Sequence, residues 1–549
     1  MPAPSDHSGV VFAHLWRILP GRSSSPRRAT RITAGRGSGI GPPGPGLLDS
    51  LTADQMTGVA SAAVPSPPGA SRFYTPVDIV SWGPRQAGRP SAREWPPLIA
   101  KHAEGDHPAR SHWAWTVSAV LLAAPAGLYF WFVDTYGVNV PYEDTWNGTL
   151  PLLRAFADGR LQLAALWAPH NENRMLVANF VGLLIDWATR MNERADMLVS
   201  GALLLLALVA ILAMATRTLR LSPLWLVPVA FLVMGLVQWE NILWAFQLAW
   251  MLVLFLCVAA LAAIEWWRGR WPGLAVPVAL ALLASYSSLQ GLLIWPVGLY
   301  YGWAVGWSRA WSAAWSAVAV GATAVYWWHF GPVGTPSRPL LFLQEPSIAA
   351  RFVGLLLGDV FGFHHLLLGG LTLLTALLVG SVVVADRRLR RTLRLPLALM
   401  GMALGFDFLV TVGRLPLGLA AAGASRYATY NLCLLAGLWL AAAFLLQRQR
   451  DWANPPRWAQ VRPAQVLAVV GVSLIVACQV VGDIPAGLAA GSAARAQREA
   501  GVQLLLHLGH ATDQAPAADL FAPSGQYVRV WAGVLHRHHW SLFAGPKRE

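Results

Sequence analysis

Two adjacent carboxylates, Glu143 and Asp144, follow the first long apolar run of the chain in the stretch VPYEDTWNG. Acidic side chains at the end of a membrane span are unfavourable unless they are paired or functional. A carboxylate in such a place can act as a general base and take a proton from a hydroxyl group. We therefore take Asp144 as the first candidate for catalysis and Glu143 as its competitor. A turn or helix cap before TWNGTL is the alternative role.

Further polar residues interrupt the later apolar runs. Arginine can bind phosphate through two hydrogen bonds at once, and aromatic side chains offer flat faces to sugar rings. Together these residue types suit a phosphosugar carried on a lipid, whereas salt bridges and anchoring at the membrane interface are their alternative roles. The candidate binding residues are His170, Glu172 and Arg174 in HNENR, Glu240, Asn241 and Gln247 in QWENILWAFQ, Arg414, Arg426 and Tyr427 in SRY, and Trp146.

Membrane helices must position these residues. Of the 549 residues, 55% are hydrophobic and only 12% are charged, which is more apolar surface than a soluble protein of this size can bury. About 20 apolar residues in a helix cross a bilayer with every backbone group satisfied. The sequence predicts an all-α polytopic membrane protein with about 11 transmembrane helices, near 113–133, 197–215, 223–238, 242–264, 272–287, 291–306, 311–328, 363–385, 396–412, 427–446 and 464–482.

Charge in the connecting loops predicts the orientation. Alternate loops carry arginines, including the cluster DRRLRRTLR at 386–394, whereas QWEN and SSLQG carry no Arg or Lys. Because Arg and Lys accumulate on the cytoplasmic side, we predict a plasma-membrane protein with its N-terminus inside and its C-terminus outside. The same rule explains the net charge of +14, and no nucleic-acid-binding module is visible.

This orientation divides the chain into three parts. Residues 1–110 are rich in Arg, Ser, Gly and Pro and are predicted to be a disordered cytoplasmic tail. Residues 111–482 form the transmembrane domain, with a first outer loop at 134–195, and residues 483–549 form an extracytoplasmic tail. Nearly all polar motifs then fall on the outer side, which predicts one outward-facing cavity.

Two local arrangements follow from spacing. In RMLVANFVGLLIDWATRMNER, Asn179, Asp186 and Arg190 fall close to one helical face, which favours a helix that lies along the membrane interface. Asp407 lies in the outer half of a span, and we expect it to pair with Arg414 two turns later.

The series YEDTW, HNENR, WENILWAFQ, SLQGLLIWPVG and SRY resembles the GT-C superfamily of membrane glycosyltransferases, which includes protein O-mannosyltransferases and bacterial lipid-A aminoarabinose transferases. The resemblance covers about residues 113–549. It implies a GT-C-like bundle with interfacial helices in the first outer loop, a bacterial inner-membrane location and a polyprenyl-phosphate sugar as donor. By motif position the catalytic role falls on Asp144. Similar proteins commonly carry histidine where this chain has Asn173.

We therefore predict a glycosyltransferase that moves a sugar from a polyprenyl-phosphate donor to an envelope glycan, lipid or protein, with no cofactor or metal ion required. A proton-coupled transporter with a relay of Asp407, Glu240, His364 and His365 is the principal alternative. Internal repeats typical of transporters are not visible, and the polar groups crowd one side. A lipid-glycan polymerase or ligase is a third possibility, although its large loop is expected late in the chain.

Overall fold

The computed structural model describes residues 112–331, 338–450, 463–507 and 520–545 of the chain. It is 83% helical, which confirms the all-α fold class. The predicted tail at 1–110 lies outside the described residues.

Eight helical segments within the described residues are long and apolar enough to cross a membrane. These eight segments confirm the prediction of a multi-pass membrane protein. The segments are built from α1 (His112–Tyr136), α5 (Glu193–Leu219), α6 (Pro223–Val233) with η2 (Leu236–Gln238) and α7 (Trp239–Leu243), η3 (Ala245–Gln247) with α8 (Leu248–Trp266), α14 (His365–Ala385), α16 (Arg394–Arg414) with η6 (Leu415–Leu417), η8 (Ser425–Tyr427) with α17 (Ala428–Arg450), and α18 (Pro463–Leu506).

Three further predicted runs form α9 (Pro272–Ser285), α10 (Ile294–Val305) and α11 (Arg309–Trp327), which fall outside these eight. The remaining helical elements are short. They are η1 (Glu143–Thr145), α2 (Thr149–Ala157), α3 (Leu163–Trp167), α4 (Leu176–Thr189), η4 (Leu289–Leu293), α12 (Leu341–Gln344), α13 (Pro346–Gly358), η5 (Asp359–Phe361), α15 (Arg387–Thr392), η7 (Leu419–Gly423), α20 (Gly525–His538) and η10 (Ser541–Phe543).

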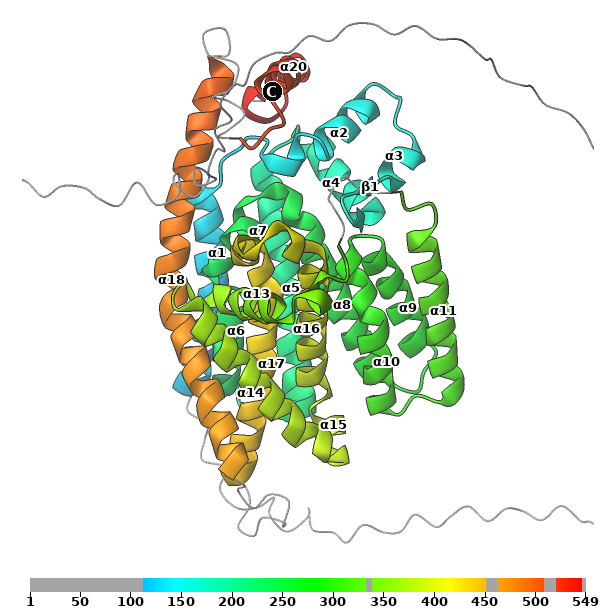
Figure 1. The fold of residues 1–549 in the computed structure, drawn as a ribbon, viewed down its shortest axis with the longest axis vertical. Helices are drawn as coiled ribbons and strands as arrows, with labels where there is room; N and C mark the ends of the chain where they lie inside the picture. Colours follow the sequence, from blue (N-terminus) through cyan, green and yellow to red (C-terminus); the bar gives the residue numbers. More distant parts are fainter. Residues whose placement is uncertain (1–111, 332–337, 451–462, 508–519, 546–549) are drawn as a thin grey trace, which may run out of the picture. The chain divides into compact units, whose positions relative to one another are not determined.

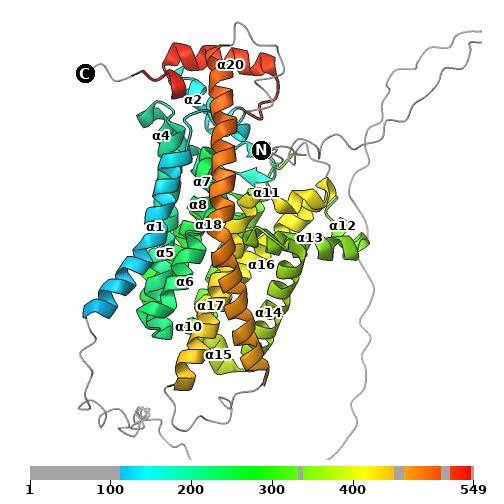
Figure 2. The same ribbon diagram turned by 90° about the vertical axis from the view of Figure 1, so that its left-hand side faces the viewer.

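The long helices pack side by side around an apolar core. Helix α5 lies against α8, α8 against α9, and α16 against α17, while α18 runs along α1, α14 and α17 (Figures 1 and 2). Small residues allow this close approach. A Cβ added at Gly201 of α5 would lie 2.6 Å from a ring carbon of Tyr129 in α1, so glycine is needed there.

The bundle has two distinct ends. Helices α2, α3, α4 and α20 gather at one end, and α15 lies at the other (Figure 1). We call them the α4 end and the α15 end. At the α4 end, β1 (Pro169–His170) and β2 (Asn173–Arg174) form an antiparallel hairpin in which His170 pairs with Asn173. Its tight turn places Asn171 at φ 50°, a conformation that asparagine tolerates.

A second apolar core joins the first loop to the C-terminal segment. Trp146 is fully buried in it, together with Leu150, Leu520 and Val528. The Tyr527 hydroxyl also donates a hydrogen bond to the Trp146 carbonyl at 3.0 Å. The segment after α18 therefore packs onto the loop that carries Glu143 and Asp144. The predicted domain boundary at 482 falls inside α18, which is one continuous helix.

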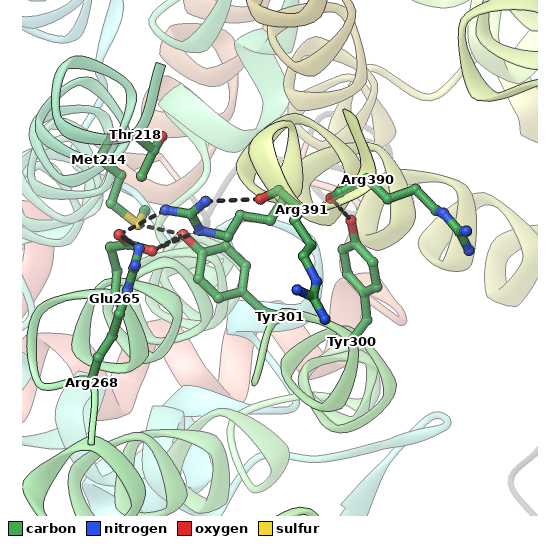
Figure 3. A network of polar contacts seen from close by, with 9 residues as sticks. Met214, Thr218, Glu265, Arg268, Tyr300, Tyr301, Arg390 and Arg391 are labelled. Atoms are coloured by element: carbon green, nitrogen blue, oxygen red, sulfur yellow. Dashed lines mark hydrogen bonds and ion pairs between the residues drawn. The ribbon is translucent and has the colours of Figure 1, made fainter. Parts of the chain in front are cut away.

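A network of ion pairs and hydrogen bonds lies at the α15 end (Figure 3). The carboxylate of Glu265 in α8 accepts hydrogen bonds from Arg394 Nε and Nη2, both at 2.9 Å, and from the Tyr301 hydroxyl at 3.1 Å. Arg268 pairs with the same carboxylate. We call these four residues the Glu265 network, which ties α8, α10 and α16 together.

Candidate functional site

Contacts from distant elements hold the acidic pair in η1. Glu143 has φ 48°, a left-handed conformation that is strained for a residue with a Cβ and is often found at functional sites. Its backbone N–H donates to the Leu520 carbonyl at 3.0 Å. The Trp244 indole donates to the Tyr142 carbonyl at 3.1 Å. The strained turn is therefore fixed on both sides by residues far away in the sequence.

Asp144 lies beside His170. Their Oδ1 and Nε2 atoms are 3.4 Å apart, and both side chains are partly exposed, at 28% and 22%. The imidazole ring also packs on Phe246, with 5.1 Å between the ring centroids. Because the His170 nitrogen forms no hydrogen bond within the described chain, the Asp144 carboxylate retains acceptor capacity. A partly exposed carboxylate with a neighbouring imidazole is a suitable general base.

Glu143 points toward a cation. Its Oε1 is 3.9 Å from Arg426 Nη1, and Glu240 Oε1 is 3.7 Å from the same nitrogen. We call these three residues the Arg426 cluster. Burial raises the pKa of Glu143 to about 7, although the nearby Arg426 charge opposes this rise. Both contacts exceed hydrogen-bond length, so the guanidinium is surrounded by charge without being tightly held.

Helix α7 and η8 fix the position of Arg426 through its backbone. The Arg426 N–H donates to Glu240 Oε2 at 2.9 Å, and the Glu240 N–H donates to the Ser425 hydroxyl at 3.1 Å. Asn241 is fully buried and donates to the Arg426 carbonyl at 2.6 Å. Asn241 therefore positions the arginine. The guanidinium itself lies over the rings of Trp244 and Tyr427, 5.8 and 5.7 Å from their centroids.

Arg414 pairs with Glu172 in the turn of the hairpin. The predicted pairing of Arg414 with Asp407 is wrong, because seven residues of helix separate these positions by about 10 Å along the axis. Asp407 is buried, and neither of its carboxylate oxygens has a hydrogen-bond partner among the described residues.

Some predicted binding residues are enclosed by the protein. Arg174 is buried and donates to the carbonyls of Tyr326 at 2.7 Å, Trp167 at 2.9 Å and Trp328 at 2.6 Å. These bonds anchor the hairpin to the end of α11. Four more predicted residues are also buried, namely Asn241 in α7, Trp146 in the second core, Gln247 in η3, and Tyr427, which stacks on Trp250.

Two charged residues near the site had not been selected from the sequence. Arg498 of α18 is 1% exposed, and its guanidinium lies 4.4 Å from the ring centroid of Tyr142. Asp359 of η5 has its pKa raised to about 7 by burial and by the charge of Glu240. Asp359 interrupts an apolar run in GDVFGFHH, a signal that was available, whereas nothing local marks Arg498.

The described residues contain no group of three or more His, Cys, Asp or Glu arranged to hold a metal ion. Neither a protein-family model nor a curated protein nor a solved structure matches the chain at a significant level. The geometry of Asp144, His170 and the Arg426 cluster is therefore the feature of the described chain that points to a function.

Proposed function

We propose that this chain is a membrane glycosyltransferase that moves a sugar from a polyprenyl-phosphate donor to a hydroxyl acceptor. One observation carries the proposal. Asp144 lies beside His170, and the preceding residue, Glu143, faces Arg426. A candidate base and a candidate phosphate-binding cation are therefore linked through one short turn.

In the proposed reaction, the Asp144 carboxylate takes the proton of the acceptor hydroxyl. The acceptor oxygen bonds to the anomeric carbon of the sugar. The bond from that carbon to the phosphate oxygen breaks, and its electron pair leaves with the polyprenyl phosphate. Arg426 stabilises the negative charge of this leaving group, as a preorganised cation does in other transfers of this type.

Glu143 has a role in admitting the donor. A phosphate that approaches Arg426 must compete with the carboxylates of Glu143 and Glu240. Because burial already raises the pKa of Glu143 to about 7, a second negative charge nearby favours its protonation. Glu143 then loses its charge when the donor binds, and Arg426 becomes free to pair with phosphate.

The proposal includes a membrane arrangement. We place the α4 end outside, α15 with its arginines inside, and the protein in a bacterial inner membrane. Helices α9, α10 and α11 complete a set of eleven spans. Helix α4 gathers with α2, α3 and α20 at one end of the bundle and carries the charged residue Asp186, so it is placed at the interface.

The test uses the full-length protein in proteoliposomes with a panel of polyprenyl-phosphate sugars and an envelope lipid extract. Mass spectrometry follows the loss of donor for wild type, Asp144→Asn and Asp407→Asn. We expect wild type and Asp407→Asn to consume a donor and Asp144→Asn to fail. The assignment is wrong if wild type consumes no donor in the panel, or if Asp144→Asn consumes donor as fast as wild type.

A proton-coupled transporter is the second candidate, because Asp407 is buried inside a span with both carboxylate oxygens unpartnered in the described chain. Intramembrane carboxylates of this kind mark proton pathways in transporters. Solute uptake driven by a pH gradient in wild type, and absent in Asp407→Asn, would favour this candidate.

A further inference from the structure

A small pocket of about 30 Å³, which has room for roughly two water-sized groups such as hydroxyls and opens to solvent, adjoins the turn that carries Asp144. It lies between η1, α2, α4, the first turn of α5 and the junction of η3 with α8. We call it the Asp186 pocket. Its polar lining consists of Thr145, Thr149, Asn179, Asp186, Glu193 and Asp196.

Three carboxyl groups in the lining are almost fully buried. Asp186 comes from α4, whereas Glu193 and Asp196 come from the first turn of α5. Burial raises the pKa of Asp186, and the neighbouring carboxyl group of Asp196 also acts on it. Two buried carboxyl groups at one site favour the protonation of one of them, and such a pair presents both a donor and acceptors. The charge of Arg498 acts on Glu193 and offsets part of the remaining negative charge.

A separate observation points to a ligand. The hydroxyl of Thr145 is buried, with the residue only 2% exposed, and has no hydrogen-bond partner within the described chain. The same holds for Glu193 Oε1 and Asp196 Oδ2. Buried polar atoms in proteins are nearly always hydrogen-bonded. Three such atoms from two elements around one pocket therefore match a partner that brings several polar hydrogens.

The pocket is adjacent to the candidate base. Thr145 directly follows Asp144, and Phe246, which also lines the pocket, packs on the ring of His170. A group held in the pocket can therefore extend a hydroxyl toward the Asp144 carboxylate.

We propose that the Asp186 pocket binds the acceptor through an uncharged, hydroxylated head group of sugar or polyol type. Hydroxyl groups both donate and accept, as the carboxyl pair and the Thr145 hydroxyl do. An uncharged ligand fits better than a cation, because the proton on this pair and Arg498 reduce the net charge of the lining. This inference depends on the proposed function, whose acceptor class it specifies.

The test measures binding without any donor. Full-length protein in nanodiscs is examined by saturation-transfer NMR with glucose, mannose, arabinose and myo-inositol as hydroxylated probes and ethylamine, which has no hydroxyl group, as the cationic probe. We expect at least one hydroxylated probe to bind wild type and to bind Thr145→Val about tenfold more weakly, because one hydrogen bond is lost.

The matched control is Thr372→Val. Thr372 is as buried as Thr145, but its hydroxyl already donates to the Leu368 carbonyl of its own helix at 2.8 Å. Binding in this variant should equal that of wild type. Asp196→Asn should also weaken binding, since it removes the carboxyl partner of Asp186 while keeping the side-chain shape.

Two results would overturn the inference: no hydroxylated probe binds wild type, whether or not ethylamine does, or Thr145→Val binds the hydroxylated probes like wild type. These outcomes are independent of donor chemistry. If the protein consumes donor but binds no hydroxylated probe, this inference is wrong and the proposed transferase activity is supported. Probe binding without donor consumption would support the pocket and remove the transferase.

Discussion

The Glu265 network and the Arg426 cluster combine the same residue types at opposite ends of the bundle and use them differently. Helix α16 runs from Arg394 in the network to Arg414 near the hairpin, about 30 Å along its axis. Glu265 is 1% exposed and accepts two 2.9 Å bonds from Arg394. Glu143 is 31% exposed and lies 3.9 Å from Arg426.

This difference separates a structural ion pair from one available to a ligand. The Glu265 carboxylate is shared among two arginines and a tyrosine, so no acceptor capacity remains for a ligand. Glu143 keeps a raised pKa, a strained backbone and a long ion pair. Satisfied charges stabilise a fold, whereas loosely paired, partly exposed charges can exchange partners.

The largest expected effect on folding comes from the Glu265 network. Glu265→Gln should lower the free energy of unfolding by about 2–3 kcal/mol, because it removes a buried carboxylate and leaves the part-buried Arg394 without a compensating charge. Chemical unfolding in detergent micelles measures this change. Glu499→Gln, which breaks the exposed pair with Arg495, is the control and should cost under about 1 kcal/mol. Equal effects would show that the Glu265 network stabilises the fold no more than an exposed ion pair does.

At the other end, Asp144→Asn should lower donor consumption by roughly 10²–10⁴-fold, the contribution of a general base. Its unfolding curve should match that of wild type, since Asp144 is partly exposed. Asp158→Asn in the same loop is the matched control and should retain activity. The assignment fails if the two variants behave alike.

Glu143 predicts a pH dependence. Below about pH 7 its carboxyl is neutral and Arg426 faces only the Glu240 charge, so a phosphodiester lipid should bind about fivefold more tightly at pH 6 than at pH 8. Glu143→Gln should remove this step. Lipid binding measured in nanodiscs at both pH values checks this prediction. If Glu143→Gln still shows the pH dependence, a group other than Glu143 is responsible for it.

The same shift affects stability. The folded state keeps a proton on Glu143 that the unfolded state releases, so stability falls as the pH rises from the ordinary glutamate pKa to about 7. The free energy of unfolding of Glu143→Gln, measured between pH 4.5 and pH 7, should therefore fall less with rising pH than that of wild type.

The smallest effect is expected at Asn173. Its side-chain oxygen accepts hydrogen bonds from the Ser288 hydroxyl at 2.7 Å and from the Leu289 N–H at 3.0 Å. Asn173→Ala should therefore cost about 1–2 kcal/mol of unfolding free energy. The exposed Asn147→Ala is the control and should change it little. Equal unfolding curves would show that these two bonds contribute nothing.

The sequence alone was sufficient to predict where the long helices lie and to select some of the residues of the candidate site. Long apolar runs specify spans locally, and polar residues that interrupt them stand out. Glu240 and Arg426 were both selected in this way, although 186 residues separate them, and the structure places them 3.7 Å apart.

Tertiary partners could not be predicted. Glu193 and Asp196 follow the N-cap Asn192 and resemble ordinary first-turn acids that favour a helix N-terminus. Only the fold brings Asp186 beside them and encloses the pocket. The pairing of Arg414 with Glu172 likewise depends on where the hairpin lies.

Helix α18 sets a strict length requirement on the chain. Its 44 residues span about 66 Å, roughly twice the thickness of the hydrocarbon core. Along it, Asp483 accepts the N–H groups of Leu236 and Val237, and Arg498 lies against Tyr142. One residue inserted between Asp483 and Arg498 would rotate the arginine by about 100° and shift it by about 1.5 Å. Deletions and insertions in this stretch should therefore be far less tolerated than substitutions on its exposed face.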